Sequence, residues 1–247
     1  MASLYLVDSL DGVTVGDTVP LDGAEGRHAV AVARVRAGET LRLSDGRGTV
    51  VTGAVTELGR DSLSLAVSEV AVDEAPSPTL TLVQALAKGG RDEMAVQAAT
   101  EIGVDRIVPW SAARSVSRWD GAKVEKGRTR WAAIAQEASK QAIRSRVPAV
   151  DAPVTTAQLA GGAGADPSRA VLVLDPAGDV RLSSWEAPAD VAEIVLVVGP
   201  EGGIDGSEFD RLVAAGAVRV RLGDTVLRTS TAGPAALAVL QTRLGRW

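Results

Sequence analysis

Two glycine-containing segments near the carboxyl terminus hold the residues best suited to chemistry. In residues 195–205, four β-favouring apolar residues run directly into Gly-Pro-Glu-Gly-Gly. In residues 218–232, a short strand ends at Gly223, and Arg228 follows shortly afterwards. Glycine lets a backbone turn sharply or approach a ligand closely, and open α/β sheets bind ligands where their strands end. The pair therefore predicts a ligand pocket, although either loop alone could be a plain strand-to-helix turn.

Each loop is followed by a helix whose start is predicted from its capping residues. Asp205 or Ser207 is expected to cap the helix after the first loop. Thr229 or Ser230 is expected to cap a closing helix over residues 232–244. The loops lie about one strand-helix unit apart, so we expect them at the same edge of one sheet.

The composition excludes several kinds of chemistry. Hydrophobic residues make up 46% of the 247 residues, enough for a sizeable core, and no apolar run approaches a membrane span in length. The absence of cysteine excludes disulfides and thiol nucleophiles, and a single histidine argues against a histidine metal site. No signal peptide is apparent, so we expect a cytoplasmic protein without a metal or a membrane partner.

Charge is distributed unevenly along the chain. The net charge is −5, yet residues 106–146 carry ten basic and three acidic side chains. A local basic surface favours contact with RNA phosphates, whereas a solvated helix face explains such a run equally well.

A linker at residues 75–78, Ala-Pro-Ser-Pro, separates two patterns. Short β-like runs precede it, and strands alternate with helices after it, which indicates a mostly parallel sheet covered by helices. We therefore predict an α/β protein with domains at residues 1–74 and 79–247. The predicted strands are 3–7, 12–19, 40–43, 48–58, 62–72, 79–86, 106–109, 170–174, 193–198 and 218–222, the predicted internal helices are 92–102 and 123–144, and residues 160–165 are predicted to form a loop.

The two loops together resemble those of the knotted SPOUT methyltransferases, and within that group they are most similar to the RsmE family. That family methylates uridine N3 in 16S (small-subunit) ribosomal RNA. The resemblance covers essentially the whole chain and implies a SPOUT trefoil-knot domain over residues 79–247 and a PUA-like RNA-binding β-barrel over residues 1–74. It also implies S-adenosyl-L-methionine as cofactor, small-subunit ribosomal RNA or the assembled subunit as partner, and a homodimer.

The resemblance places the cofactor against both loops and the end of the strand at 170–174. Leucine and valine side chains would form apolar walls, and glycines would expose backbone groups. The residues implied to bind the cofactor are Leu174, Val198, Gly199, Pro200, Glu201, Gly202, Gly203, Leu222, Gly223, Leu227, Arg228, Thr229 and Ala232.

Two of these residues are also the catalytic candidates. Uridine N3 carries a proton near neutral pH, so the proton must be removed or the resulting anion stabilised. Arg228 is the candidate for stabilising charge on the uracil oxygens, and Glu201 for orienting groups at the loop. An ion pair of Arg228 with Asp224 or Glu201 is an equally good interpretation, and no residue stands out as a general base.

The resemblance implies RNA contacts by His28, Arg34, Gln141 and Arg144. Lys88 and Arg91 follow a strand and precede a helix, so they are expected to bind RNA phosphate near that helix start. Glu137, Gln141 and Arg144 are spaced to share one helix face, for which a solvated stripe is the alternative. A lone histidine that packs against a short helix is the alternative for His28. The family often has glutamate where Ser230 stands and lysine where Ala98 stands, so neither position is expected to supply that charge.

Two other classes of protein were considered. A non-catalytic RNA-binding protein would use the barrel and the basic helix alone and would not bind S-adenosylmethionine. A nucleotide-binding enzyme is disfavoured because the sequence contains neither Gly-x-Gly-x-x-Gly after the first strand nor a Gly-Lys-Ser/Thr loop.

Overall fold

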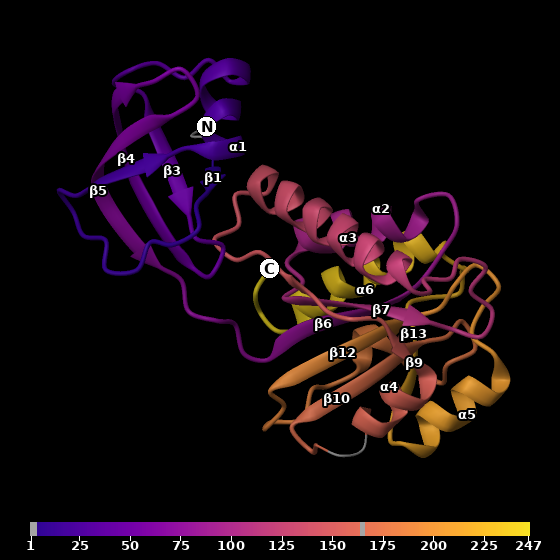
Figure 1. Ribbon diagram of the computed structural model, residues 1–247. Coiled ribbons are helices and arrows are strands. Elements are labelled where there is room, and N and C mark those ends of the chain that lie inside the picture. The colour runs from indigo at the N-terminus through magenta and orange to yellow at the C-terminus, as the bar shows by residue number, and fades with distance from the viewer. Residues whose placement is uncertain (1–3, 164–165) are drawn as a thin grey trace. The chain divides into compact units, whose positions relative to one another are not determined.

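The computed structural model describes residues 4–163 and 166–247, and the chain divides into two compact units (Figure 1). The first unit comprises Met1–Ala75 and Ser139–Val147, and the second comprises Pro76–Ala138 and Pro148–Trp247. Nothing in the sequence pattern indicated that residues 139–147 join the first unit.

The first unit is built on a five-stranded sheet in the order β1-β3-β4-β5-β2. Leu43 and Leu65 are fully buried in its core. The strand predicted over 12–19 is replaced largely by turns, because the Asp17 carboxylate accepts a hydrogen bond from the Thr14 N–H at 2.7 Å. The elements are β1 (Leu4–Leu6), β2 (Thr18–Leu21), α1 (Gly23–Arg27), the π-helix η1 (His28–Val32), β3 (Thr40–Ser44), β4 (Thr49–Leu58) and β5 (Leu63–Val72).

Backbone hydrogen bonds hold residues 139–147 to the first unit. The Val147 N–H donates to the Gly46 carbonyl at 2.9 Å, and the Gly48 N–H donates to the Ser145 carbonyl at 3.1 Å. These bonds join the segment to the turn between β3 and β4, so its hydrogen bonds are satisfied by residues far away in sequence.

The second unit contains one sheet in the order β11-β13-β10-β12-β6-β7-β8, with β9 also beside β7, and all of its described strand pairs are parallel. The elements are β6 (Thr79–Ala85), α2 (Arg91–Ile102), β7 (Arg106–Ser111), α3 (Ala122–Gln141), β8 (Ala149–Val150), β9 (Val154–Thr155), α4 (Thr156–Ala163), β10 (Arg169–Leu174), β11 (Val180–Arg181), the short η2 (Leu182–Ser184), β12 (Glu193–Val198), α5 (Gly206–Ala214), β13 (Val218–Arg221) and α6 (Thr229–Arg243).

Helices cover both faces of this sheet. Figure 1 shows α2, α3 and α6 on one face and α4 and α5 on the other. Within β12, Ile194 and Leu196 pack with the first group, whereas Val195 and Val197 pack with the second. Burial on both faces explains the uninterrupted apolar run in this strand. The predicted α/β class with a mostly parallel sheet is confirmed.

Three sequence predictions about helices need correction. The helix predicted over 123–144 ends at Gln141, because Ile143 adopts a left-handed conformation with φ 56°. Residues 156–163 form α4 where a loop was predicted over 160–165, because burial of Leu159 and Ala163 outweighs the two helical glycines; residues 164 and 165 lie outside the described residues.

The third correction concerns the cap of α6. Arg228 is its N-cap residue and makes no side-chain capping bond, so neither Thr229 nor Ser230 caps the helix. Asp205 does cap α5, since its carboxylate accepts a hydrogen bond from the Ser207 N–H at 3.0 Å. None of the helices in the described ranges has the length and apolar character needed to cross a membrane.

Candidate functional site

A cavity of about 540 Å³ lies within the second unit, where β10, β12 and β13 end. Its volume falls in the range of small-molecule sites. Both predicted loops line it. Of the predicted cofactor-binding residues, the structure places these around the cavity: Leu174, Val198, Gly199, Pro200, Glu201, Gly203, Leu222, Gly223, Leu227, Arg228, Thr229 and Ala232.

The end of β10 separates the two loops, because this strand lies between β12 and β13. It contributes Asp175, whose buried carboxylate accepts a hydrogen bond from Arg219 Nε at 2.6 Å. The Arg219 guanidinium also lies 4.9 Å from the ring centre of Phe209, and both Asp175 and Phe209 line the cavity. Arg219 thus holds Asp175 and Phe209 together in one wall of the cavity. Sequence reasoning missed all three residues, although the alternation of valine and arginine in β13 was a signal for Arg219.

The first loop makes a tight turn that opens onto the cavity. The Gly203 N–H donates to the Pro200 carbonyl at 2.9 Å, and Gly203 has φ 74°, a conformation that favours glycine. Among the described residues, apart from Gly203 and its two chain neighbours, no atom lies within 4 Å of the position that a Cβ on Gly203 would occupy. Gly202 is not among the lining residues, because its carbonyl accepts a hydrogen bond from Arg114 Nη1 at 3.3 Å outside the cavity.

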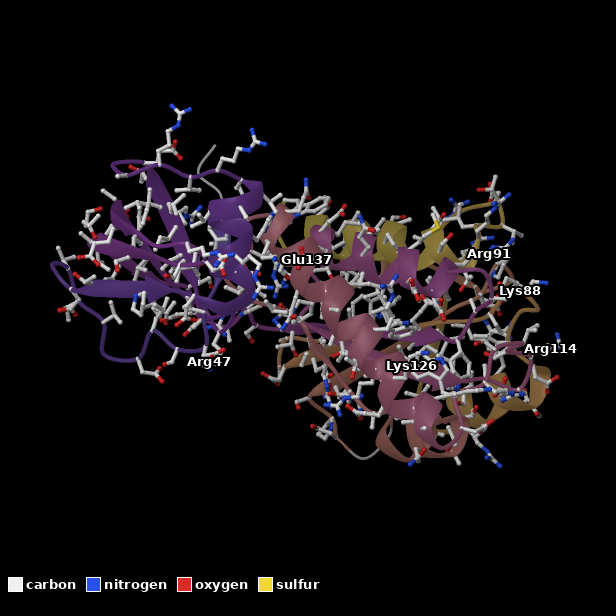
Figure 2. The ribbon with its side chains drawn as sticks, turned by 45° about the horizontal axis from the view of Figure 1, so that its top comes forward. Arg47, Lys88, Arg91, Arg114, Lys126 and Glu137 are labelled. Carbon is white, nitrogen blue, oxygen red and sulfur yellow. The ribbon has the colours of Figure 1, made fainter. Side chains whose placement is uncertain are left out.

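Cationic residues hold this loop through two carboxylates. Arg91 Nη1 lies 3.1 Å from Glu201 Oε1, and the backbone N–H of Lys88 donates to the same oxygen at 3.2 Å. Arg114 Nη2 lies 3.0 Å from Asp205 Oδ2. Figure 2 shows Lys88, Arg91 and Arg114 at the same end of the second unit. The candidates Lys88 and Arg91 therefore lie beside the cavity, and Arg91 lines it.

Glu201 is held in its ionised form. Burial opposes ionisation, but the backbone N–H groups of Glu201 and Lys88, together with the Arg91 guanidinium, outweigh it and lower the pKa of the Glu201 carboxyl. A carboxylate held in this way is a weak proton acceptor, so the geometry supports the orienting role expected for Glu201.

This ionisation gives a pH prediction. Because the folded-state pKa lies below the ordinary value of 4.5, Glu201 contributes stability above that value and loses the contribution as pH falls through its lowered pKa. We expect Glu201→Gln to be less stable than the parent by up to about 1 kcal/mol at pH 7, and the difference to shrink in acid. Urea unfolding at pH 7 and pH 3.5 measures this, with Glu101→Gln on α2 as control. A difference that grows in acid would contradict it.

Arg228 is exposed and lines the cavity at the start of α6. The alternative of an ion pair with Asp224 or Glu201 is not found among the described residues, where Asp224 pairs with Arg181 at 3.9 Å and Glu201 pairs with Arg91. The guanidinium of Arg228 is therefore available to a ligand or substrate in this structure.

The remaining RNA-contact candidates lie in the first unit. His28 and Arg34 are exposed; the His28 ring makes an edge contact with Tyr5 at a centroid distance of 6.1 Å, and Arg34 has φ 56°. Gln141 is exposed at the end of α3, whereas Arg144 follows the helix and its N–H donates to the Ser139 carbonyl at 2.9 Å. The prediction that Arg144 shares a helix face with Glu137 and Gln141 is therefore wrong.

A parallel sheet covered on both faces, with a cavity formed by two backbone-rich loops at its carboxyl edge, defines an α/β ligand-binding domain. The family model described as an RNA methyltransferase domain matches residues 73–241, and the one described as an RNA methyltransferase PUA domain matches residues 21–68. Curated relatives refine this class. The chain is 43% identical to ribosomal RNA small subunit methyltransferase E of Mycobacterium tuberculosis, covering 100% of this chain and 94% of the relative.

Solved structures agree with this similarity. The chain is similar, at 29% identity and a TM-score of 0.87, to ribosomal RNA small subunit methyltransferase E of Neisseria gonorrhoeae bound to S-adenosyl methionine, with 98% of each chain covered. A methyltransferase of Legionella pneumophila in complex with the same cofactor gives 28% identity and a TM-score of 0.85, again with 98% of each chain covered. This chain belongs to the ribosomal RNA small subunit methyltransferase E family. The resemblance seen in the sequence is confirmed, as is the PUA-like domain.

Proposed function

We propose that this chain transfers a methyl group from S-adenosylmethionine to N3 of a uridine in 16S ribosomal RNA. The observation that carries the proposal is the cavity between the two loops of an RNA methyltransferase domain. We also propose that residues 1–74 hold RNA, that residues 79–247 form the knotted catalytic domain, and that the protein acts as a cytoplasmic homodimer.

The cavity has the features that such a cofactor requires. Leu174, Leu222 and Leu227 provide apolar lining, suited to the faces of an adenine ring. At Gly203 and Gly223 an added Cβ would meet no atom within 4 Å from other described parts of the chain beyond the adjacent residues, so backbone groups there are open to a ligand. When bound, S-adenosylmethionine supplies a methyl group on a positively charged sulfur.

The chain's own residues would position the substrate and stabilise its charge. Loss of the N3 proton leaves negative charge on the uracil oxygens, and a guanidinium stabilises such charge with paired N–H donors. Arg228 provides an exposed guanidinium at the cavity. Glu201, already bonded to Arg91 and Lys88, would keep the first loop in shape rather than move a proton.

Calorimetry with S-adenosylmethionine, followed by mass mapping of small-subunit RNA from a deletion strain, tests this function. We expect binding at one site per chain and the loss of a single methyluridine that returns on complementation. RNA binding without cofactor binding would instead support a non-catalytic RNA-binding protein. A missing methyl group on another base or ring position would overturn the uridine N3 assignment.

A further inference from the structure

Gln84 is a buried polar residue that neither loop contains. It lies in β6, pairs in register with Val198 of β12, and is fully buried among apolar strand residues. A buried amide is costly unless its groups find hydrogen-bond partners. The hydrogen-bond partners of Gln84 therefore indicate its role.

Hydrogen bonds connect Gln84 to the starting points of both the first loop and α6. Gln84 Nε2 donates to the Ala85 carbonyl at 3.1 Å and to Thr229 Oγ1 at 2.9 Å. The Thr229 hydroxyl donates to the Gly199 carbonyl at 2.7 Å. Because a carbonyl can only accept, the Gln84 amide must turn its NH₂ group toward the Ala85 carbonyl. Thr229 Oγ1 therefore accepts from that NH₂ group, and the single proton of the Thr229 hydroxyl is directed to the Gly199 carbonyl.

The positions of these partners matter for the cavity. Gly199 begins the first loop, Thr229 directly follows the second loop, and both line the cavity, whereas Gln84 does not. Gln84 Oε1 has no hydrogen-bond partner within the described residues. An apolar side chain would avoid that unsatisfied acceptor, so a contribution to stability alone does not account for glutamine at this position.

We propose that Gln84 is a positioning residue for the cofactor cavity. Gln84 acts through Thr229 to fix the Gly199 carbonyl, and so it joins the beginning of the first loop to the beginning of α6. The proposal rests on the cofactor proposed above. It assigns Gln84 no contact with cofactor or RNA.

Gln84→Met tests the proposal, because it removes the donor while keeping a side chain of similar length. We expect the Kd for S-adenosylmethionine, measured by calorimetry, to rise about tenfold, as loss of one hydrogen bond suggests. Amide hydrogen exchange of residues 199–205 in the ligand-free protein should also accelerate. Thr229→Val should have the same effects, and Thr229→Ser should lose less affinity than Thr229→Val because it keeps the hydroxyl. The Gln84→Met/Thr229→Val double variant should be no worse than either single variant.

Gln241→Met is the matched control. Gln241 is a second buried glutamine whose Oε1 has no hydrogen-bond partner in the described ranges, and its Nε2 donates to the Ile102 and Gly103 carbonyls, outside the cavity lining. We expect it to lower Tm without changing the Kd. Equal losses of affinity in both variants, or unchanged affinity and exchange in Gln84→Met, would overturn the positioning role. A parent protein that binds no S-adenosylmethionine would overturn the cofactor proposal, while loop exchange would still test the role of Gln84.

Discussion

Replacing Arg228 by alanine is expected to lower kcat about 10²- to 10³-fold, the usual effect of removing one preorganised donor from a developing anion. The Kd for S-adenosylmethionine should change by less than about threefold, because the adenine walls and glycine backbone remain in place. Arg228 is exposed at the cavity and makes no ion pair among the described residues, so its charge is not committed to the fold. Arg228→Lys should recover part of the rate, since it keeps the charge but loses the planar pair of donors.

Single-turnover methylation of small-subunit particles, together with calorimetry, separates these effects. Arg243→Ala is the control, because Arg243 is another partly exposed arginine of α6 and pairs with Glu186 at 3.9 Å, outside the cavity lining. It should leave both kcat and Kd unchanged. If Arg228→Ala weakens cofactor binding and leaves kcat unchanged, Arg228 belongs to cofactor binding and has no role in stabilising the uracil anion.

The local parts of the site could be predicted from sequence because they depend on neighbouring residues. A buried strand followed by glycines placed the first loop correctly, and Asp205 was correctly expected as a helix cap. The prediction for Thr229 was wrong because its hydroxyl oxygen accepts a hydrogen bond from Gln84 Nε2 and its proton goes to the Gly199 carbonyl, so the oxygen does not accept from the backbone of its own helix. A capping preference describes only how nearby backbone groups compete for a hydroxyl. Here Gln84, which is distant in sequence, is the hydrogen-bond partner instead.

The contacts that complete the site join distant parts of the chain. Gln84 meets Thr229 across 145 residues, and Arg91 meets Glu201 across 110. No local pattern marks such pairs, since they follow from the order of strands in the sheet. For the same reason the sequence did not indicate that residues 139–147 would pack with the first unit.

The basic segment at 106–146 carries less free charge than its composition suggests. Several of its cations are already paired: Arg106 with Asp151, Arg114 with Asp205, Arg130 with Glu93, and Lys140 with Glu25. A count of charges from sequence does not distinguish these structural pairs from charges available to RNA. RNA binding by this segment is therefore best tested at individual residues rather than inferred from the total.

Replacing Gly203 by valine is expected to raise the Kd for S-adenosylmethionine by at least about 100-fold. The described structure leaves room for a side chain, since no atom beyond the adjacent residues lies within 4 Å of a Cβ at Gly203, but the backbone has φ 74° and the residue lines the cavity. A β-branched residue in that conformation costs about 1–3 kcal/mol, and its methyl groups would also occupy space that a ligand needs. Gly203→Ala should have a smaller effect, about tenfold, because it brings the strain with less bulk.

Calorimetry with S-adenosylmethionine in the absence of RNA measures this loss, and thermal unfolding reports whether each variant is folded. Gly206→Ala is the matched control: Gly206 begins α5, has no positive φ, does not line the cavity, and likewise has no atom within 4 Å of an added Cβ. It should bind with parent affinity and gain slight helix stability. Because Gly203 and Arg228 lie on different loops, loss of affinity in one variant and of rate in the other would assign separate roles to the two loops. Parent affinity in Gly203→Val would mean that the turn at Gly203 does not shape the binding site.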